Sequence, residues 1–342
     1  MDVNKNEFLL PNMIKGKVDT NNQEIFRYSI TTSDVLIART SETIKEIAYS
    51  SCLLENIANC TYSGFLLKAS PKIKNIIFPP YIVLLLRSQI YRKRLMKLST
   101  ETSRALINSD NLAKLIINIS KFKEQKKIWL FFNLLLKKIT ITEQKIETLK
   151  KYKEGLDQTA FTEGSTIKLG SLIEQLNIRN KSLKKIHIFS ISNQFGFIPH
   201  EDIFLGKTIS LKNKKNYKIV EKYQFAYNPA RINVGSIACQ TYDIGQVSPM
   251  YIVFKTERNN VEILNEWFHS RFFIKEINSN LEGSVRKILT FENLSNLLIK
   301  WPKDRLIYSR AFTKVNLKIN LLLQQLNDLK MLKKYLLNKL FV

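Results

Sequence analysis

An internal repeat constrains this chain more than any single residue does. Residues 125–161 and 305–341 align at a constant offset of 180 residues, and apolar side chains recur in both copies at alternating steps of three and four. Such spacing is typical of the seam of a coiled coil. The predicted seam residues are Phe132, Leu135, Ile139, Ile146 and Leu149 in the first copy, and Phe312, Val315, Ile319, Leu322, Leu326 and Leu329 in the second. We interpret the repeat as one duplicated module whose long helices pack on each other.

The two copies also share an irregularity. After Leu149 and Leu329 the pattern slips by one position, and we expect the seams to continue through Tyr152 and Leu156, matched by Leu332 and Leu336. A shared slip favours duplication over two unrelated amphipathic helices. Each helix of about 34 residues would be about 50 Å long at about 1.5 Å per residue. The chain then divides into a first domain at residues 1–123, a central helix at 124–161, a second domain at 162–303 and a C-terminal helix at 304–342.

The net charge narrows the choice of partner. Lys plus Arg number 54 against 29 for Asp plus Glu, which gives +25, and the excess runs along both halves of the chain. Self-repulsion on this scale favours a polyanionic partner, either nucleic acid or an anionic membrane surface. A hydrophobic content of 44% and 20 Phe argue against disorder.

Several classes of protein do not fit the sequence. The first 15 residues include Asp2, Lys5, Glu7 and Pro11, so we expect no secretory signal. No apolar run approaches the ~20 residues that a membrane span needs. The three cysteines have no CxxC spacing, the three histidines form no HExxH, and no GxxxxGK[ST] loop is present. We therefore expect a cytoplasmic protein with no metal site and no catalytic site of its own.

The duplication extends more weakly into the globular parts. Residues 28–47 and 217–236 each combine a polar approach, an apolar strand and a polar turn with an arginine. A second short strand region follows in each copy, at residues 60–67 and 250–254, and then a helical stretch at 81–98 and 261–277. Strands followed by helices in this order predict an α+β domain that occurs twice, with two long antiparallel coiled-coil helices separating the copies.

Arginine with Asn or Ser neighbours at the end of a strand suits DNA recognition. A guanidinium can bind the O6 and N7 atoms of guanine, and an Asn amide can bind adenine. Ser–Arg pairs can also hold phosphates, which fixes position without reading sequence. The candidate DNA-binding residues are Arg39, Ser41, Ser103, Arg104, Ser192, Asn228, Arg231, Asn233, Ser284 and Arg286. For each of them the alternative is an ordinary charged or polar surface turn.

Longer motifs connect the chain to a known family. The strings YNPARINVGSI at residues 227–237, VSPMY at 247–251 and GSVR at 283–286 strongly resemble target-recognition domains of type I restriction-modification specificity subunits. ARTSET at 38–43 with YSS at 49–51 is similar to another variety of the same domain, and the helices that begin at residue 124 and end near 161 and 341 resemble the two spacer helices of that family.

The resemblance implies a DNA reader without catalysis. Each recognition domain of such a subunit reads one half of a split DNA site, and two antiparallel helices set the gap. The expected partners are double-stranded DNA, two modification (methyltransferase) subunits and a restriction (translocase and nuclease) subunit. The expected cofactors S-adenosylmethionine, ATP and Mg²⁺ belong to those partners.

One departure from the family pattern concerns the first domain. In the second domain Tyr217 lies 51 positions after Thr166, whereas only 27 residues precede Tyr28. We expect the first domain to lack an opening portion. Three explanations are open: a start codon placed too late, a truncated silent copy from a recombining locus, or a split domain whose missing strands another chain supplies. A basic coiled-coil scaffold that binds RNA or anionic lipid without sequence preference is a further alternative.

Overall fold

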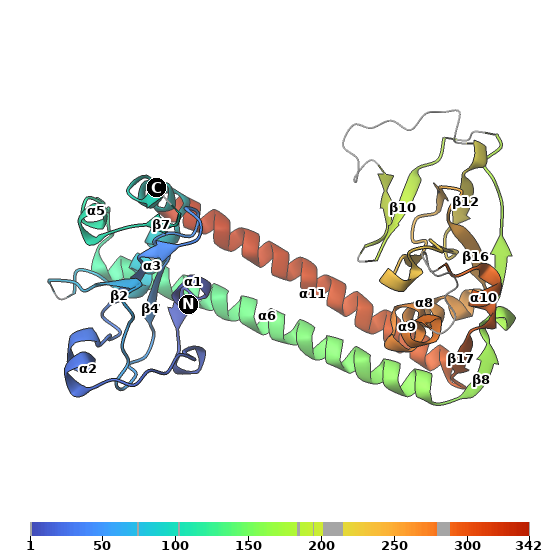
Figure 1. Ribbon diagram of the computed structural model, residues 1–342, viewed down its shortest axis with the longest axis horizontal. Coiled ribbons are helices and arrows are strands. Elements are labelled where there is room, and N and C mark those ends of the chain that lie inside the picture. The colour runs from blue at the N-terminus through green and yellow to red at the C-terminus, as the bar shows by residue number, and fades with distance from the viewer. Residues whose placement is uncertain are drawn as a thin grey trace. The chain divides into compact units, whose positions relative to one another are not determined.

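The computed structural model describes residues 2–73, 75–101, 103–182, 185–193, 195–200, 215–278 and 288–341 (Figure 1). The chain separates into two compact units. Unit 1 contains Met1–Gln144 and Leu323–Val342, and unit 2 contains Lys145–Leu322. Each unit therefore includes one globular part and a portion of both long helices, and each is described by itself.

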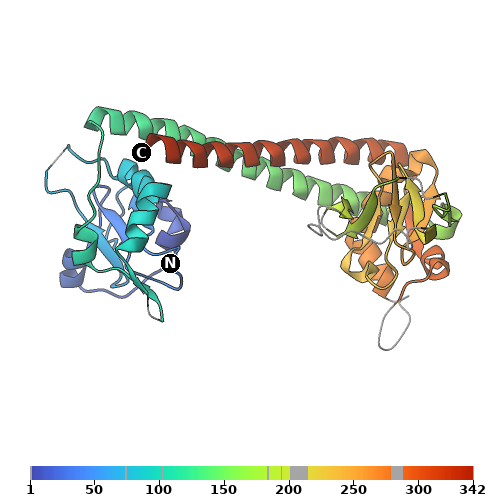
Figure 2. The ribbon, with the colours of Figure 1, turned by 90° about the horizontal axis from the view of Figure 1, so that it is seen from above.

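The long helices are α6 (Phe122–Thr162) and α11 (Arg305–Leu340). Neither contains a proline, and Pro302 lies just before α11, where a proline does not interrupt the hydrogen-bond ladder. Within unit 1 the two helices run antiparallel, since Phe132 near the start of α6 shares an apolar cluster with Phe341, whereas Glu143 pairs with Lys330 at 2.7 Å. Within unit 2 the end of α6 lies beside the start of α11 (Figure 2). There the Phe161 and Phe312 rings stack with their centroids 6.3 Å apart.

The seam follows the three–four spacing. The buried members are Phe132, Leu135, Ile139, Ile146, Phe312, Val315, Ile319 and Leu322. The remaining three, Leu149, Leu326 and Leu329, are half-buried. The prediction that the seam continues through Tyr152 and Leu332 is wrong, because their side chains are 55% and 43% exposed.

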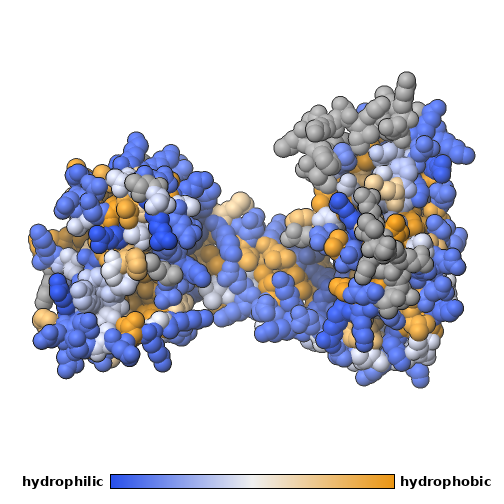
Figure 3. Space-filling model, viewed as in Figure 1, coloured by the Kyte–Doolittle hydropathy of each residue, from blue (hydrophilic) through white to orange (hydrophobic). Residues whose placement is uncertain are grey.

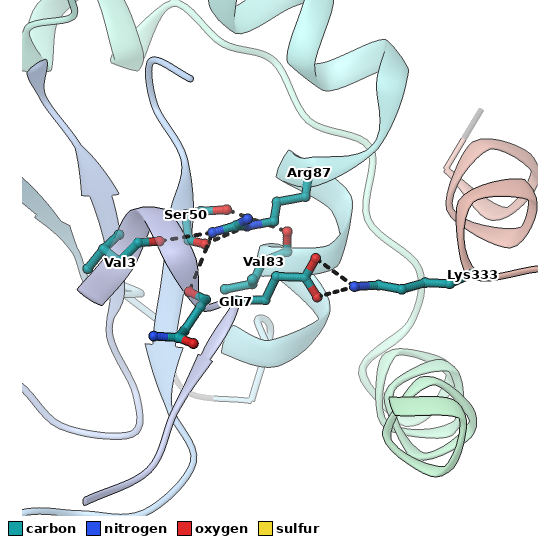
Figure 4. A network of polar contacts seen from close by, with 7 residues as sticks. Val3, Glu7, Ser50, Val83, Arg87 and Lys333 are labelled. Atoms are coloured by element: carbon teal, nitrogen blue, oxygen red, sulfur yellow. Dashed lines mark hydrogen bonds and ion pairs between the residues drawn. The ribbon is translucent and has the colours of Figure 1, made fainter. Parts of the chain in front are cut away.

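Lysines occupy the inward positions instead of Tyr152 and Leu332. Lys153 on α6 pairs with Glu266 at 2.6 Å in unit 2, and Lys333 on α11 pairs with Glu7 at 2.7 Å in unit 1. Figure 4 shows Lys333 reaching from α11 to the Glu7 carboxylate. At the position where the apolar pattern slips, each helix therefore has an inward lysine that forms an ion pair with its own unit. We call these two ion pairs the ionic anchors. Hydrophobic periodicity points to the neighbouring apolar residues because it does not register an inward lysine that has a carboxylate partner.

Unit 1 is built on a four-stranded sheet. Its strand order is β1 (Phe8–Leu9), β4 (Ser50–Leu53), β2 (Val35–Ala38) and β5 (Leu66–Ala69), with β1 parallel to β4 and the other pairs antiparallel. A small sheet joins β3 (Thr40–Ser41), β7 (Ala105–Leu106) and β6 (Thr100–Glu101). The helices of this part are α1 (Asp2–Lys5), α2 (Asn22–Tyr28), α3 (Pro79–Arg87), α4 (Gln89–Lys97) and α5 (Ser109–Ala113).

Helix α3 supplies much of the unit 1 core. Its first two residues are prolines, which suit a helix start because those N–H groups have no intrahelical partner. Every residue from Pro79 to Leu86 is buried, against β2 and β4 on one side and the start of α6 on the other. At the end of α3, Arg87 donates hydrogen bonds to the carbonyl groups of Ser50 at 2.8 Å and Val3 at 3.0 Å, which ties α1 to the sheet (Figure 4).

The described residues of unit 2 form three sheets. The first has the order β14 (Ile237–Cys239), β13 (Phe225–Tyr227), β16 (Ile252–Thr256) and β9 (Ile173–Leu176). The second has the order β11 (Gly196–Pro199), β10 (Ile188–Ser192), β15 (Ile244–Val247) and β12 (Lys218–Glu221), and the third pairs β17 (Leu298–Trp301) with β8 (Ser165–Lys168). The helices are α8 (Val261–His269), α9 (Arg271–Asn278) and α10 (Phe291–Asn296).

The two units share a central meander. Strands β4, β2 and β5 of unit 1 and β14, β13 and β16 of unit 2 are antiparallel and in the same order, and a broken helix pair follows each set. The break falls at Ser88 between α3 and α4 and at Ser270 between α8 and α9, and both serines are buried. The outer strands differ: β9 extends the meander beyond β16, whereas β5 is the last strand in its sheet.

Candidate nucleic-acid interface

The loop at residues 228–236 of unit 2 connects the central strand β13 to β14. The Asn228 N–H donates to the carbonyl of Ser236 at 3.0 Å, and the Asn228 Oδ1 accepts the N–H of Ala230 at 3.0 Å. The side-chain oxygen of Asn228 thus stabilises the turn. Arg231 and Asn233 are exposed on this loop.

Gly235 sets the loop against the β10–β11 hairpin. It has φ +84°, in the left-handed region that glycine adopts without strain, and a Cβ there would lie 3.1 Å from Asn193 Cβ. Ser236 Oγ donates to the carbonyl of Ile191 at 3.4 Å, and Ser192 Oγ accepts the N–H of Phe195 at 3.3 Å. The fold therefore brings Ser192, a sequence candidate, beside the loop that contains Arg231.

Three exposed apolar side chains occur on these two segments and on the connection from β15 to β16. Phe195 is 70% exposed, Val234 58% and Met250 59%, and Asn228 Nδ2 lies 3.6 Å from the Met250 sulfur. Aromatic and aliphatic side chains beside polar ones suit contact with base edges and faces. Sequence reasoning missed Asn193 and Phe195, although the Asn-Gln-Phe-Gly string that ends at Gly196, with φ +67°, has the composition of a tight turn.

In unit 1 the fold joins two candidates that are distant in sequence. Arg39 is exposed between β2 and β3, where its N–H donates to the carbonyl of Phe65 at 2.9 Å and its carbonyl accepts the N–H of Ile107 at 3.0 Å. Ser103 and Arg104 are exposed in the connection from β6 to β7, and β7 pairs with β3. One small sheet thus supports Arg39 at one end and the Ser103–Arg104 turn nearby.

Three of the predicted residues need separate comment. Ser41 is only 7% exposed, and its Oγ accepts the Thr43 N–H at 3.5 Å, so the expectation that it contacts DNA is wrong: the side chain faces the protein. Ser284 and Arg286 lie outside the residues that the structure describes.

The exposed arginines differ from the arginines of the interior. Within the described ranges, no carboxylate forms an ion pair with Arg39, Arg104 or Arg231. By contrast, Arg87 and Arg92 both lie 4.7 Å from the centre of the Tyr49 ring. Burial lowers the pKa of Arg92 to about 10, with Arg87 adding to the shift and Tyr49 opposing it. These two arginines hold the fold together, whereas the exposed three are available to an anion.

A family model matches the first part of the chain. Residues 3–151 match the type I restriction modification DNA specificity domain. This part of the chain therefore belongs to the type I restriction modification DNA specificity domain family. The match covers the unit 1 meander, with Arg39, Ser103 and Arg104, and most of α6.

Solved structures share the fold of this chain over most of its length. The S subunit of a type I restriction-modification system from M. genitalium superimposes with a TM-score of 0.62 at 13% identity, covering 92% of this chain and 84% of that one. A chain from a structure of complex assembly and conformational transition of a type I system has a TM-score of 0.50 at 12% identity, covering 91% and 82%. No match was found among curated protein sequences.

The protein presents hydrophilic side chains over most of the face drawn in Figure 3. Among the residues with a described position, no helix is long and apolar enough to cross a membrane. In the same part of the chain, no group of three His, Cys, Asp or Glu side chains is placed to hold a metal ion.

Proposed function

We propose that this specificity subunit reads a bipartite DNA site, with one recognition domain for each half of the site and α6 and α11 as the spacer. In this proposal the subunit acts on DNA in the cytoplasm and has no catalytic activity. It docks two methyltransferase subunits and a restriction subunit. Those partners bring S-adenosylmethionine, ATP and Mg²⁺.

One observation carries the proposal. In each unit, the segment that follows the central strand of the shared meander bears an exposed arginine: Arg39 after β2 and Arg231 after β13. An exposed guanidinium on a rigid strand end can form two hydrogen bonds to guanine, which are worth about 1–3 kcal/mol of discrimination. The same element in two domains of one chain fits a site that is read in two places.

The Arg231 loop offers the sharper test. The subunit is assembled with its methyltransferase partner, and methylation is measured on DNA that carries the cognate site. Arg231→Ala should lower methylation about tenfold or more, corresponding to the loss of one bidentate base contact, while the assembled complex still forms. Unchanged methylation would exclude Arg231 from recognition.

Two further variants distinguish base recognition by Arg231 from a phosphate contact and from a general loss of charge. Arg231→Lys keeps the charge but not the planar fork, so it should restore activity if Arg231 contacts phosphate and should fail to do so if Arg231 reads guanine. Arg310→Ala removes an exposed arginine from α11 of the same unit and serves as the matched control, with methylation unchanged.

The net charge of +25 favours a second candidate, a scaffold that binds nucleic acid without sequence preference. Such a scaffold would bind random and cognate DNA alike, with a steep dependence on salt. A specificity subunit should hold its own site at least about 10³ times more tightly than random DNA at physiological salt.

A further inference from the structure

The internal repeat shows how the outer edge of the meander is covered in unit 2. The segment from β8 through the turn Leu169–Ser171 to β9 pairs with β17 on one side and with β16 on the other. Leu169 is fully buried, Ile173 is 8% exposed, and both belong to the main apolar core of unit 2. The Leu169 N–H donates to the carbonyl of Leu297 at 2.9 Å, which fixes the segment against the end of α10.

Unit 1 has the same surroundings for such a segment. At an offset of 182 residues, α5 with residues 114–119 matches α10 with residues 296–301, and both helices begin with a capping side chain, Asn108 or Thr290, that accepts the N–H of an asparagine three residues later. Strand β5 occupies the place of β16 in the meander. The described residues of unit 1 place no strand beside β5 on its outer side and none beside residues 116–119.

Exposure marks the difference between the two units. Leu112, Leu115 and Ile117 are half-buried, whereas their counterparts Leu294, Leu297 and Ile299 are at most 1% exposed. Ala69 on β5 is exposed, whereas its counterpart Phe254 is fully buried. The apolar hollow between β2, β5 and α5 has a volume of about 180 Å³ and is lined by residues that include Val35, Ile37, Ala69, Leu112, Leu115 and Ile117. We refer to this hollow as the unit 1 groove.

The basic side chains beside the groove favour an acidic residue in the bound segment. Arg94, Lys97 and Lys114 line a neighbouring hollow of about 540 Å³ together with Ile116, which is 79% exposed. In unit 2 the counterpart of Ile116, Leu298, is paired with Lys168 of β8. A segment seated in unit 1 would therefore place its residue at the Lys168 position beside three cations, where a carboxylate is favoured.

We propose that the unit 1 groove binds a strand–turn–strand segment of a partner polypeptide. The segment has the apolar pattern of residues 165–176, with an acidic residue at the position of Lys168. It adds one strand to β5 and one to residues 116–119, so that backbone hydrogen bonds and buried Leu or Ile side chains supply the affinity. The proposal stands apart from DNA recognition, since it concerns the opposite end of the sheet order from β1 and involves none of the candidate DNA-binding residues.

The first described residues of the chain do not occupy the groove. Residues 2–9 are held at the other edge of the sheet, where β1 pairs with β4 and where Val3 and Leu9 are 3% and 2% exposed. The three cations at the rim indicate the source, because they favour a polypeptide with a carboxylate where this chain's own segment has Lys168.

The test uses the full-length protein and a synthetic peptide with the sequence of residues 165–176, labelled for fluorescence anisotropy. We expect saturable binding and slower amide hydrogen exchange at residues 66–69 and 116–119. The peptide with Lys168→Glu should bind more tightly. The peptide with Leu169→Asp should bind about tenfold or more weakly, because an unpaired carboxylate is costly in an apolar hollow.

Protein variants locate the binding site. Ile117→Asp should abolish binding, and Val18→Asp, at a residue 72% exposed elsewhere in unit 1, should leave it unchanged. If Ile117→Asp fails to fold, hydrogen exchange on the unaltered protein decides the question. In a last experiment, the sequence of residues 165–176 is fused after Val342 and thermal stability is measured. This position is chosen because Phe341 is the counterpart of Phe161, which precedes β8 in unit 2.

Each outcome decides the proposal. Saturable binding of the free peptide, with protection at both predicted edges, supports it. Absence of binding by the free peptide, together with no gain in thermal stability from the joined segment, would overturn the groove as a binding site. Stabilisation by the joined segment alone would overturn the partner chain as its source, and weaker binding of the Lys168→Glu peptide would overturn the acidic residue.

Discussion

Gly235 determines the shape of the Arg231 loop. Its φ of +84° and the 3.1 Å approach to Asn193 leave little room for a side chain. Gly235→Ala should lower the stability of the folded protein by about 1–2 kcal/mol through backbone strain and crowding. Thermal unfolding measures this loss. Gly64→Ala, where a Cβ meets nothing within 4 Å, is the control and should have little effect.

Asp157 on α6 is a second residue with a measurable role. Burial, together with nearby Glu266, raises the pKa of its carboxyl to about 7, and Lys153 opposes the shift. The folded state therefore binds a proton between about pH 4 and pH 7 that the unfolded chain has released, so stability falls as pH rises through this window.

Replacing the carboxyl by an amide removes this pH-dependent cost. Asp157→Asn should raise the melting temperature at about pH 8 and have a smaller effect at about pH 5. Asp328→Asn, at an exposed position of α11, serves as the control. An Asp157→Asn variant with the same stabilisation at both pH values would contradict the assignment.

Single residues also mark the limit of what the sequence predicts. The exposed positions of Arg39 and Arg231 follow from polar strings after apolar strands, and both were identified. Ser41 lies in the same kind of string but is buried, because the pairing of β3 with β7 turns it inward. That pairing joins residues more than 60 positions apart, and no local pattern encodes it.

At the scale of elements, substitutions in the long helices test which side chains form the seam. Phe132 on α6 is fully buried in the unit 1 core, whereas its neighbour Phe131 is 50% exposed. Phe132→Ala should cost about 3–5 kcal/mol of unfolding free energy, through lost burial and the cavity that remains. Phe131→Ala should cost much less. Equal losses in chemical denaturation would contradict the burial pattern of the seam.

Helices and sheets differed in how well the sequence predicted them. The three–four spacing and the 180-residue repeat located α6 and α11 because helical contacts are local in sequence. The β10–β15 pair is parallel and joins residues about 58 apart, and it follows from the fold as a whole. The ionic anchors at Lys153 and Lys333 could not be predicted from the hydrophobic pattern for a related reason. Their partners, Glu266 and Glu7, are distant in sequence.

At the scale of the whole molecule, two units with little sequence in common share one meander and one broken helix pair. The expectation of a repeated α+β domain with two long antiparallel helices is confirmed, and the M. genitalium S subunit shares this fold. The base sequence that the protein reads could not be predicted, because it depends on side-chain contacts at a DNA surface that no sequence pattern fixes.

We propose above that this chain gives a methyltransferase complex its DNA sequence preference. Methylome sequencing of cells that express the chain with its methyltransferase partner tests it most directly, with cells that carry Arg231→Ala for comparison. We expect one bipartite methylated motif with a constant gap, and weaker or altered methylation of that motif in the variant. Methylation without such a motif, or an identical motif and extent of methylation in both strains, would contradict it.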